Sequence, residues 1–246
     1  MSGKLWTFAI VAAIAASSPI VSTPSQAQSG SVNPATQTRA PHVFGTIALP
    51  LKSTRFDDRW QRALHGGAVT GQLTSLVREA RRAPQIEQLR LVNASLNDRI
   101  RYRHDTQPSG DHWSTAGETL SRSAGDCEDY VIAKFQALKA VGVPERDLFM
   151  TIGHDGFAGA VHAVLVVRAG GQFFVLDNRN NQLIPDRQYR GFYPMITFGA
   201  RSSWLHGYER GQTPAAVRAI NIALQSNREL KLGNSGGSAS PRAMRR

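Results

Sequence analysis

A single cysteine constrains this 246-residue chain more than any other feature. Cys127 stands where a glycine-containing turn gives way to an amphipathic segment. Along that segment Val131, Phe135 and Leu138 recur at i, i+4 and i+7, which is helical spacing. The first turn of a helix offers free backbone N–H groups and the positive end of the helix dipole, and both favour a thiolate. The position therefore suits a nucleophilic cysteine.

A buried structural role is the alternative for Cys127, because a free cysteine usually behaves as a small hydrophobe. The neighbouring acids Asp126, Glu128 and Asp129 would raise the pKa of the thiol unless something neutralised them. The nucleophile hypothesis therefore depends on partners elsewhere in the chain.

The first residues have the form of an export signal. Lys4 precedes an apolar run over residues 5–16, and residues 25–27 place small side chains where a signal peptidase reads them. A membrane anchor is the alternative, but this run is shorter than the roughly 20 residues that cross a bilayer. We expect residues 1–27 to be a cleaved signal peptide and the mature protein to be periplasmic or secreted, with no transmembrane segment. A lone thiol in an oxidising compartment is a liability unless it is buried or used.

The remaining chain divides into three parts. Residues 28–40 predict a flexible linker, and residues 233–246, with glycines, serines and terminal arginines, predict a disordered basic tail. Residues 41–232 suffice for one domain with a sizeable core. The chain carries 29 Lys and Arg against 18 Asp and Glu, and most of this charge covers a solvated face. Nucleic acid is one partner that such charge suits, but export favours an acidic substrate, lipid head groups or cell-wall polymers.

Periodicity and turn residues place the secondary structure of the domain. Helices are expected over about 55–64, 70–82, 86–100, 127–140 and 214–230, with a short element before the cysteine turn. Strands are expected over 148–152, 161–167, 172–176 and 192–198. Residues 41–51 are expected to drape over the domain, and 179–187 and 204–208 to be loops. Asn93 and Asn97 lie one turn apart on the third helix, where surface or cap roles are commoner than a functional site, and hydrogen bonds to a neighbouring loop are a further alternative.

His162 and Asp177 are the partners that a predicted hairpin brings within reach. A two-residue Gly-Gly turn after Ala169 would pair that residue with Gln172, and Asp177 would then face Val164. His162 lies one same-face step farther, along a diagonal of about 7–8 Å that long side chains can close. A three-residue loop would put the two side chains on opposite faces of the hairpin.

With the two-residue register, these residues can form a catalytic triad. Asp177 holds the imidazole of His162 at one nitrogen, and the other nitrogen is presented to Cys127. Thiol chemistry needs this arrangement, because the histidine moves protons and the acid fixes its tautomer. A strand-end histidine and an aspartate that caps Asn178 are the separate alternatives. The order of Cys, His on a strand, and Asp at the end of the next strand favours the triad.

Four motifs lie at characteristic separations: Asp111-x-Trp113-x-x-x-x-Glu118, Gly125-Asp126-Cys127-Glu128-Asp129-Tyr130, His162-Ala163-Val164-Leu165 and Leu176-Asp177-Asn178. Together with Asn93, Asn97 and Tyr102, they resemble the bacterial transglutaminase-like cysteine proteinases. This family includes the LapG-type periplasmic proteases that release biofilm adhesins. The resemblance covers roughly residues 55–198, and it rests on the combination, because any one motif alone is weak.

The resemblance implies an α+β, papain/transglutaminase-like fold, with a helical N-terminal part and the nucleophile helix packed on an antiparallel β-sheet. It implies Cys127 as nucleophile, His162 as base and Asp177 as orienting acid, with the backbone N–H of Cys127 donating to an oxyanion. Trp113 matches an aromatic residue that lines the substrate groove. A core or lid tryptophan is the alternative.

The resemblance also implies calcium. LapG-type members bind it through the acids flanking the cysteine, which here match Asp126 and Glu128. Hard oxygens suit calcium, and the cation would cancel the unfavourable charge beside the thiol. Two acids two residues apart do not share a helical face, so they converge only if Asp126 lies outside the helix. Without a metal, Asp126 is a helix cap.

We therefore expect a periplasmic cysteine protease that cleaves a protein substrate through an acyl-cysteine. The family suggests an acidic surface adhesin as substrate and an inner-membrane receptor as regulator. Acyl transfer to an amine, as in transglutaminases, and a non-catalytic module that binds peptide or cell wall are the alternatives. The strong positive charge and the arginine-rich tail have no counterpart in the family pattern.

Overall fold

The computed structural model of the chain describes residues 38–66, 71, 73–104, 112–209, 211–215 and 217–218. The expected signal peptide, most of the linker, the basic tail and most of the helix expected over 214–230 lie outside the described residues. Within these ranges, no helix has both the length and the apolar character that a membrane span requires.

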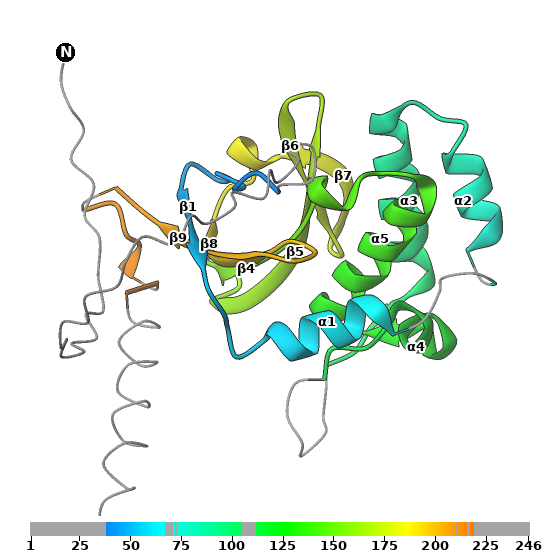
Figure 1. Ribbon diagram of the computed structural model, residues 1–246, viewed down its shortest axis with the longest axis horizontal. Helices are drawn as coiled ribbons and strands as arrows, with labels where there is room; N and C mark the ends of the chain where they lie inside the picture. Colours follow the sequence, from blue (N-terminus) through cyan, green and yellow to red (C-terminus); the bar gives the residue numbers. More distant parts are fainter. Residues whose placement is uncertain are drawn as a thin grey trace, which may run out of the picture.

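Among the described residues, five α-helices gather on one side of the molecule and an antiparallel sheet forms the other (Figure 1). The helices are α1 (Asp57–His65), α2 (Thr74–Ala80), α3 (Gln85–Arg99), α4 (Ala116–Arg122) and α5 (Cys127–Val141). Short 3-10 turns follow at η2 (Glu145–Asp147) and η3 (Asp186–Gln188). The predicted α+β class, with its helices mainly in the N-terminal part, is confirmed.

The sheet of the described chain has seven strands in the order β1-β9-β8-β4-β5-β6-β7, all antiparallel to their neighbours. The strands are β1 (Ile47–Leu51), β4 (Leu148–Asp155), β5 (Ala160–Ala169), β6 (Gln172–Asp177), β7 (Asn180–Pro185), β8 (Phe192–Phe198) and β9 (Ser203–Gly207). A separate parallel pair joins β2 (Arg101–Tyr102) to β3 (Ala124–Gly125). This pair ties the end of α3 to the residues just before α5.

The cysteine helix α5 packs against α3, α4 and strand β5. Val131, Phe135 and Leu138, whose spacing predicted the helix, are all buried. Gly142 ends the helix with a φ of 113°, a left-handed conformation that costs glycine little. The predicted packing of the nucleophile helix on the sheet is therefore observed.

The β5–β6 hairpin has the register that a two-residue turn requires. Ala169 pairs with Gln172, and the ladder continues to Leu165 opposite Leu176. The next residues in this register place Val164 opposite Asp177, as the sequence predicted. Because side chains alternate along a strand, His162 lies on the same face as Val164.

Two segments that were expected to be loops contain strand residues, and those two expectations were wrong; the segment expected to drape over the domain also contains a strand. The loop expected over 179–187 contains β7, the stretch 204–208 begins within β9, and the draping segment 41–51 contains β1. β7 is an edge strand in which half of the residues are polar, and α3 packs against it. β1 and β9 pair with each other across more than 150 residues of chain, so local alternation gives little sign of either. Proline at position 194 is tolerated in β8 because the β4–β8 register shifts beside it, between Ile152 and Gly153.

Candidate active site

Two side chains of the β5–β6 hairpin form a buried pair. Nε2 of His162 lies 2.8 Å from Oδ1 of Asp177, and their exposed fractions are only 1% and 5%. Burial alone would raise the pKa of Asp177, but the hydrogen bond to His162 and the charge of His162 hold that pKa at about 2. Asp177 is therefore ionised, and it fixes Nε2 as the nitrogen that carries a proton. Nδ1 is left to accept one.

Tyr189 completes the hydrogen bonding of Asp177, and the sequence analysis missed it. Its hydroxyl donates to Oδ2 of Asp177 at 2.6 Å, while the backbone N–H of Arg179 donates to Oδ1 at 3.3 Å. Burial and the charge of the carboxylate raise the pKa of Tyr189, so its hydroxyl keeps its proton and stays a donor. Tyr189 follows a stretch without apolar periodicity, so no local pattern marks it.

Cys127 opens α5 with its side chain largely buried. Its S–H donates to Oε2 of Glu128 at 2.9 Å. Burial and then the charge of Glu128 raise the pKa of the thiol well above its usual range, although the backbone N–H of Ala163 acts in the opposite sense. In this arrangement Cys127 is a protonated thiol. Ala163 directly follows His162, so the sulfur lies against the strand that carries the imidazole.

Asp126 and Glu128 flank Cys127 in the chain, and Asp126 lies outside α5, which is the condition for the two acids to share a ligand. Asp126 lies before the helix, with an extended backbone at φ −95° and ψ −167°, and its side chain makes no capping hydrogen bond. Both carboxylates are hard oxygen donors that suit calcium in kind. Calcium takes about six to eight oxygens, so backbone carbonyls and water would have to complete the set. In the described part of the chain, no cluster of three or more His, Cys, Asp and Glu side chains is arranged to hold a metal.

The third acid of the motif, Asp129, has a structural position. It is fully buried, accepts the backbone N–H of Ser114 at 2.8 Å and lies 3.5 Å from the guanidinium of Arg122. These contacts fasten the chain before α4 to the first turn of α5.

Trp113 lies in the core rather than in a groove. Its side chain has no exposed surface. The ring stacks on Phe56 with centroids 5.6 Å apart and meets Trp60 and Phe198 edge-on at 6.4 and 5.9 Å. This placement fits the alternative of a core tryptophan.

Asn93 and Asn97 hold the turn after Asp177. The amide of Asn93 donates to the carbonyl of Asn180 at 2.8 Å, and that of Asn97 donates to the carbonyl of Asp177 at 2.9 Å. Of the two roles considered for these amides, hydrogen bonds to a neighbouring loop are the one observed.

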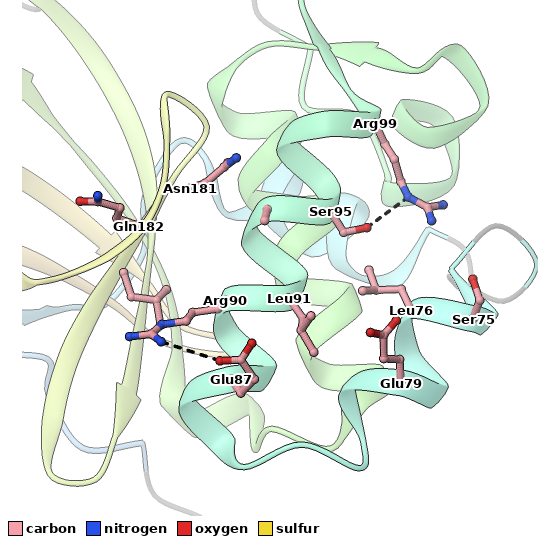
Figure 2. A pocket seen from close by; sticks show the side chains of 12 residues that line it. Ser75, Leu76, Glu79, Glu87, Arg90, Leu91, Ser95, Arg99, Asn181 and Gln182 are labelled. Carbon is pink, nitrogen blue, oxygen red and sulfur yellow. Dashed lines mark hydrogen bonds and ion pairs between the residues drawn. The ribbon is translucent and has the colours of Figure 1, made fainter.

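A hollow of about 670 Å³ lies between α2, α3 and β7 (Figure 2). The pairs Arg90–Glu87 and Arg99–Ser95 border it. None of the predicted catalytic residues lines it, so it is separate from the candidate active site.

A cysteine at the start of a helix, packed on a sheet that carries a buried His–Asp pair, defines the class of papain-like thiol hydrolases. A family profile described as bacterial transglutaminase-like cysteine proteinase (BTLCP) matches residues 67–200, more than half of the chain. The chain belongs to this family and is a cysteine peptidase of the transglutaminase-like type.

Solved structures of LapG from Legionella pneumophila share the fold. One is 25% identical, covers 63% of this chain and 89% of that protein, and superposes with a TM-score of 0.50. A calcium-bound form is 23% identical, covers 68% and 98% of the two chains, and has a TM-score of 0.51. An EGTA-treated form is 24% identical, covers 70% and 97%, and has a TM-score of 0.50. No curated protein sequence matched the chain.

Proposed function

We propose that this peptidase is periplasmic or secreted and cleaves a protein substrate through Cys127, His162 and Asp177. The observation that carries the proposal is the buried 2.8 Å pair of His162 and Asp177, on a strand whose next residue, Ala163, contacts the sulfur of Cys127.

In the proposed mechanism each residue of the triad has one role. Nδ1 of His162 takes the thiol proton, and the thiolate of Cys127 attacks the carbonyl carbon of the substrate. His162 then gives that proton to the leaving amine, and an acyl-cysteine remains. A water molecule, deprotonated by the same imidazole, releases the acid and restores the thiol. Asp177 stays ionised throughout and stabilises the imidazolium.

The backbone N–H of Cys127 supports the negative oxygen that forms during the attack. Residues of the first turn have no intrahelical acceptor for this group, and the dipole of α5 adds positive potential at the same place. A donor of this kind, aimed at a developing oxyanion, typically contributes about 10²–10³-fold to the rate.

Asp126 and Glu128 are the residues that would hold calcium. When bound, the cation would offset their charges, and this would lower the pKa of the Cys127 thiol toward the range in which a thiolate forms. Without such a cation, the carboxylate of Glu128 accepts the hydrogen bond of the Cys127 thiol and favours its protonated form.

The signal-like residues 1–27 support export, and the net charge of +11 supports an acidic substrate. Within this proposal the substrate is a surface adhesin and the regulator an inner-membrane receptor, as the family resemblance suggests.

A thiol probe tests the triad without knowledge of the substrate. Wild-type protein, loaded with calcium, should react with iodoacetamide at Cys127 at neutral pH. His162→Ala should react about 10²-fold more slowly, because the imidazole no longer stabilises the thiolate. Equal labelling of both proteins would point instead to a non-catalytic binding module.

Comparison of the cell-envelope proteome with and without Cys127→Ser tests the substrate. We expect one surface protein to be shed only when the thiol is intact. A protein that gains mass, through a new bond to a lysine amine, would identify acyl transfer in place of hydrolysis.

A further inference from the structure

Lys134 is a charged residue in the interior that the mechanism leaves unused. It lies on α5 seven residues after Cys127, about two helical turns, and its side chain has no exposed surface. Its Nζ has no hydrogen-bond partner within the described part of the chain. A buried amine without a partner is costly, so its presence in a largely buried helix requires an explanation.

Two buried acceptors lie on the neighbouring helix. Oδ1 of Asn93 and Oδ1 of Asn97 are also buried without a partner in the described structure. The amide nitrogens of the same side chains are bonded to the turn at 177–180, at the carbonyls of Asn180 and Asp177. α3 packs directly on α5, so the unpartnered donor and the two unpartnered acceptors belong to helices in contact, and the two amides hold the turn.

Electrostatics connects Lys134 to the same turn. Burial lowers the pKa of Lys134 to about 7, and the carboxylate of Asp177 opposes that shift. The ring of Tyr130, one turn earlier on α5, lies 5.7 Å from Nζ and offers its negative face to a cation.

Among the charged groups of the described residues, Asp177 acts on Lys134, and Asp177 also interacts with Arg179. On α3 the buried side-chain oxygens without a partner belong to the two neutral amides, and on β5 the buried titratable group is His162, which is bonded to Asp177 itself. The charged residues of α2 and α4 that border this region are exposed at the surface: Arg78, Glu79, Glu118 and Arg122. The charge of Lys134 therefore acts chiefly on the Asp177–His162 pair.

We infer that Lys134 is a positioning residue of the active site: through buried water shared with the amide oxygens of Asn93 and Asn97, its ammonium group ties the cysteine helix to the turn that carries Asp177. A polar site with three such groups meets the requirement of a buried water for about two to four partners. An apolar side chain at this position would make the protein more stable, so the charge serves the site and not the fold. This inference rests on the proposed triad.

The test replaces Lys134 and follows the reactivity of Cys127. Lys134→Met removes both the charge and the hydrogen bonding, while Lys134→Gln removes only the charge. Lys139→Met is the matched control, because Lys139 lies on the same helix but at the surface, paired with Glu145. The rate of alkylation by iodoacetamide is measured between about pH 5 and pH 9, and kcat and KM are measured once a substrate is known.

Removal of a nearby positive charge raises the pKa of each acidic group that it faces. Both Lys134 variants should therefore raise, by about 0.5 pH unit, the apparent pKa that governs alkylation of Cys127 below pH 7. At a given pH in that range the alkylation rate should fall roughly threefold. Above pH 7, where Lys134 is largely neutral, the alkylation rate should change less. In turnover kcat should fall while KM stays constant, because Lys134 does not touch substrate. Lys139→Met should match the wild type.

Thermal unfolding separates these outcomes from misfolding. If Lys134→Met fails to fold, the profile of Lys134→Gln decides the question. A folded Lys134 variant with the wild-type profile and wild-type kcat would overturn the inference and leave the triad standing. Failure of the triad would appear separately, as wild-type reactivity in His162→Ala.

Discussion

Nε2 of His162 and Oδ1 of Asp177 meet at 2.8 Å diagonally across the β5–β6 hairpin, just beyond the last residues of its ladder. The contact exists because a two-residue turn sets the register, and one residue more in that turn would send the two side chains to opposite faces. The geometry of the His162–Asp177 pair thus depends on a turn at the far end of the hairpin.

The low pKa of Asp177 predicts a pH-dependent contribution to stability. Its folded-state pKa is about 2, against an ordinary value of 3.8. The contribution should be present in full above about pH 4 and should be lost as the pH falls toward 2. The difference corresponds to about 2 kcal/mol. Urea unfolding of the wild type and of Asp177→Asn, measured between these limits and at neutral pH, checks this. Parallel stability curves for the two proteins would contradict it.

Tyr189→Phe should lower kcat about tenfold with the fold intact. The substitution removes one hydroxyl, which donates to Asp177 at 2.6 Å, and hydrogen bonds to charged groups contribute about 1.5–3 kcal/mol. The pKa of Asp177 should rise, because a group that stabilises its ionised form is lost. Tyr208→Phe is the control, since its hydroxyl donates at the same 2.6 Å to the carbonyl of Pro194, a neutral acceptor. Equal kcat values for the two variants would exclude a positioning role for Tyr189.

Gly125→Ala should impair both stability and thiol reactivity. A Cβ at this position would lie 2.5 Å from Cβ and Oδ2 of Asp129, a buried side chain that fastens the first turn of α5 to Ser114. We expect a loss of about 1–3 kcal/mol in the free energy of unfolding and slower alkylation of Cys127. In α4, Gly117→Ala meets nothing within 4 Å and should be neutral or stabilising by up to about 1 kcal/mol. Similar melting temperatures for the two variants would refute the proposed clash.

Calcium should raise the melting temperature and quicken the alkylation of Cys127 at neutral pH, because it would offset the charges of Asp126 and Glu128. EGTA should reverse both effects, and magnesium at equal concentration should not reproduce them, since it loses its water reluctantly. In EGTA, Glu128→Gln should react faster than the wild type, because the charge that raises the pKa of the thiol is gone. A full calcium response in the double variant Asp126→Asn and Glu128→Gln would place the cation elsewhere.

Much of the candidate site could be predicted from local sequence patterns. Helical spacing placed Cys127 in the first turn of α5, and the Gly-Gly turn was enough to put His162 and Asp177 on one face. Both depend on interactions between residues close in the chain, and periodicity and turn chemistry report those directly.

Other features could not be read in this way. Tyr189 reaches Asp177 from a segment without periodicity, and β1 and β9 pair across most of the domain. Lys134 interrupts an apolar run. The sequence shows that a charged residue stands there, but it does not show which groups surround that residue in the fold. Trp113 matched a motif that suggested exposure in a groove, whereas its aromatic neighbours come from α1 and β8, far away in the chain.

The proposed nucleophile belongs to the helical layer and the His–Asp pair to the sheet, so the proposed active centre depends on the packing of α5 against β5. Slippage of one layer over the other by about an ångström would leave both intact and still cost about a hundredfold in rate. On heating, the hydrolysis rate should therefore decrease before the secondary structure unfolds. A ligand that binds the beginning of α5 could likewise change the turnover rate without contacting the imidazole.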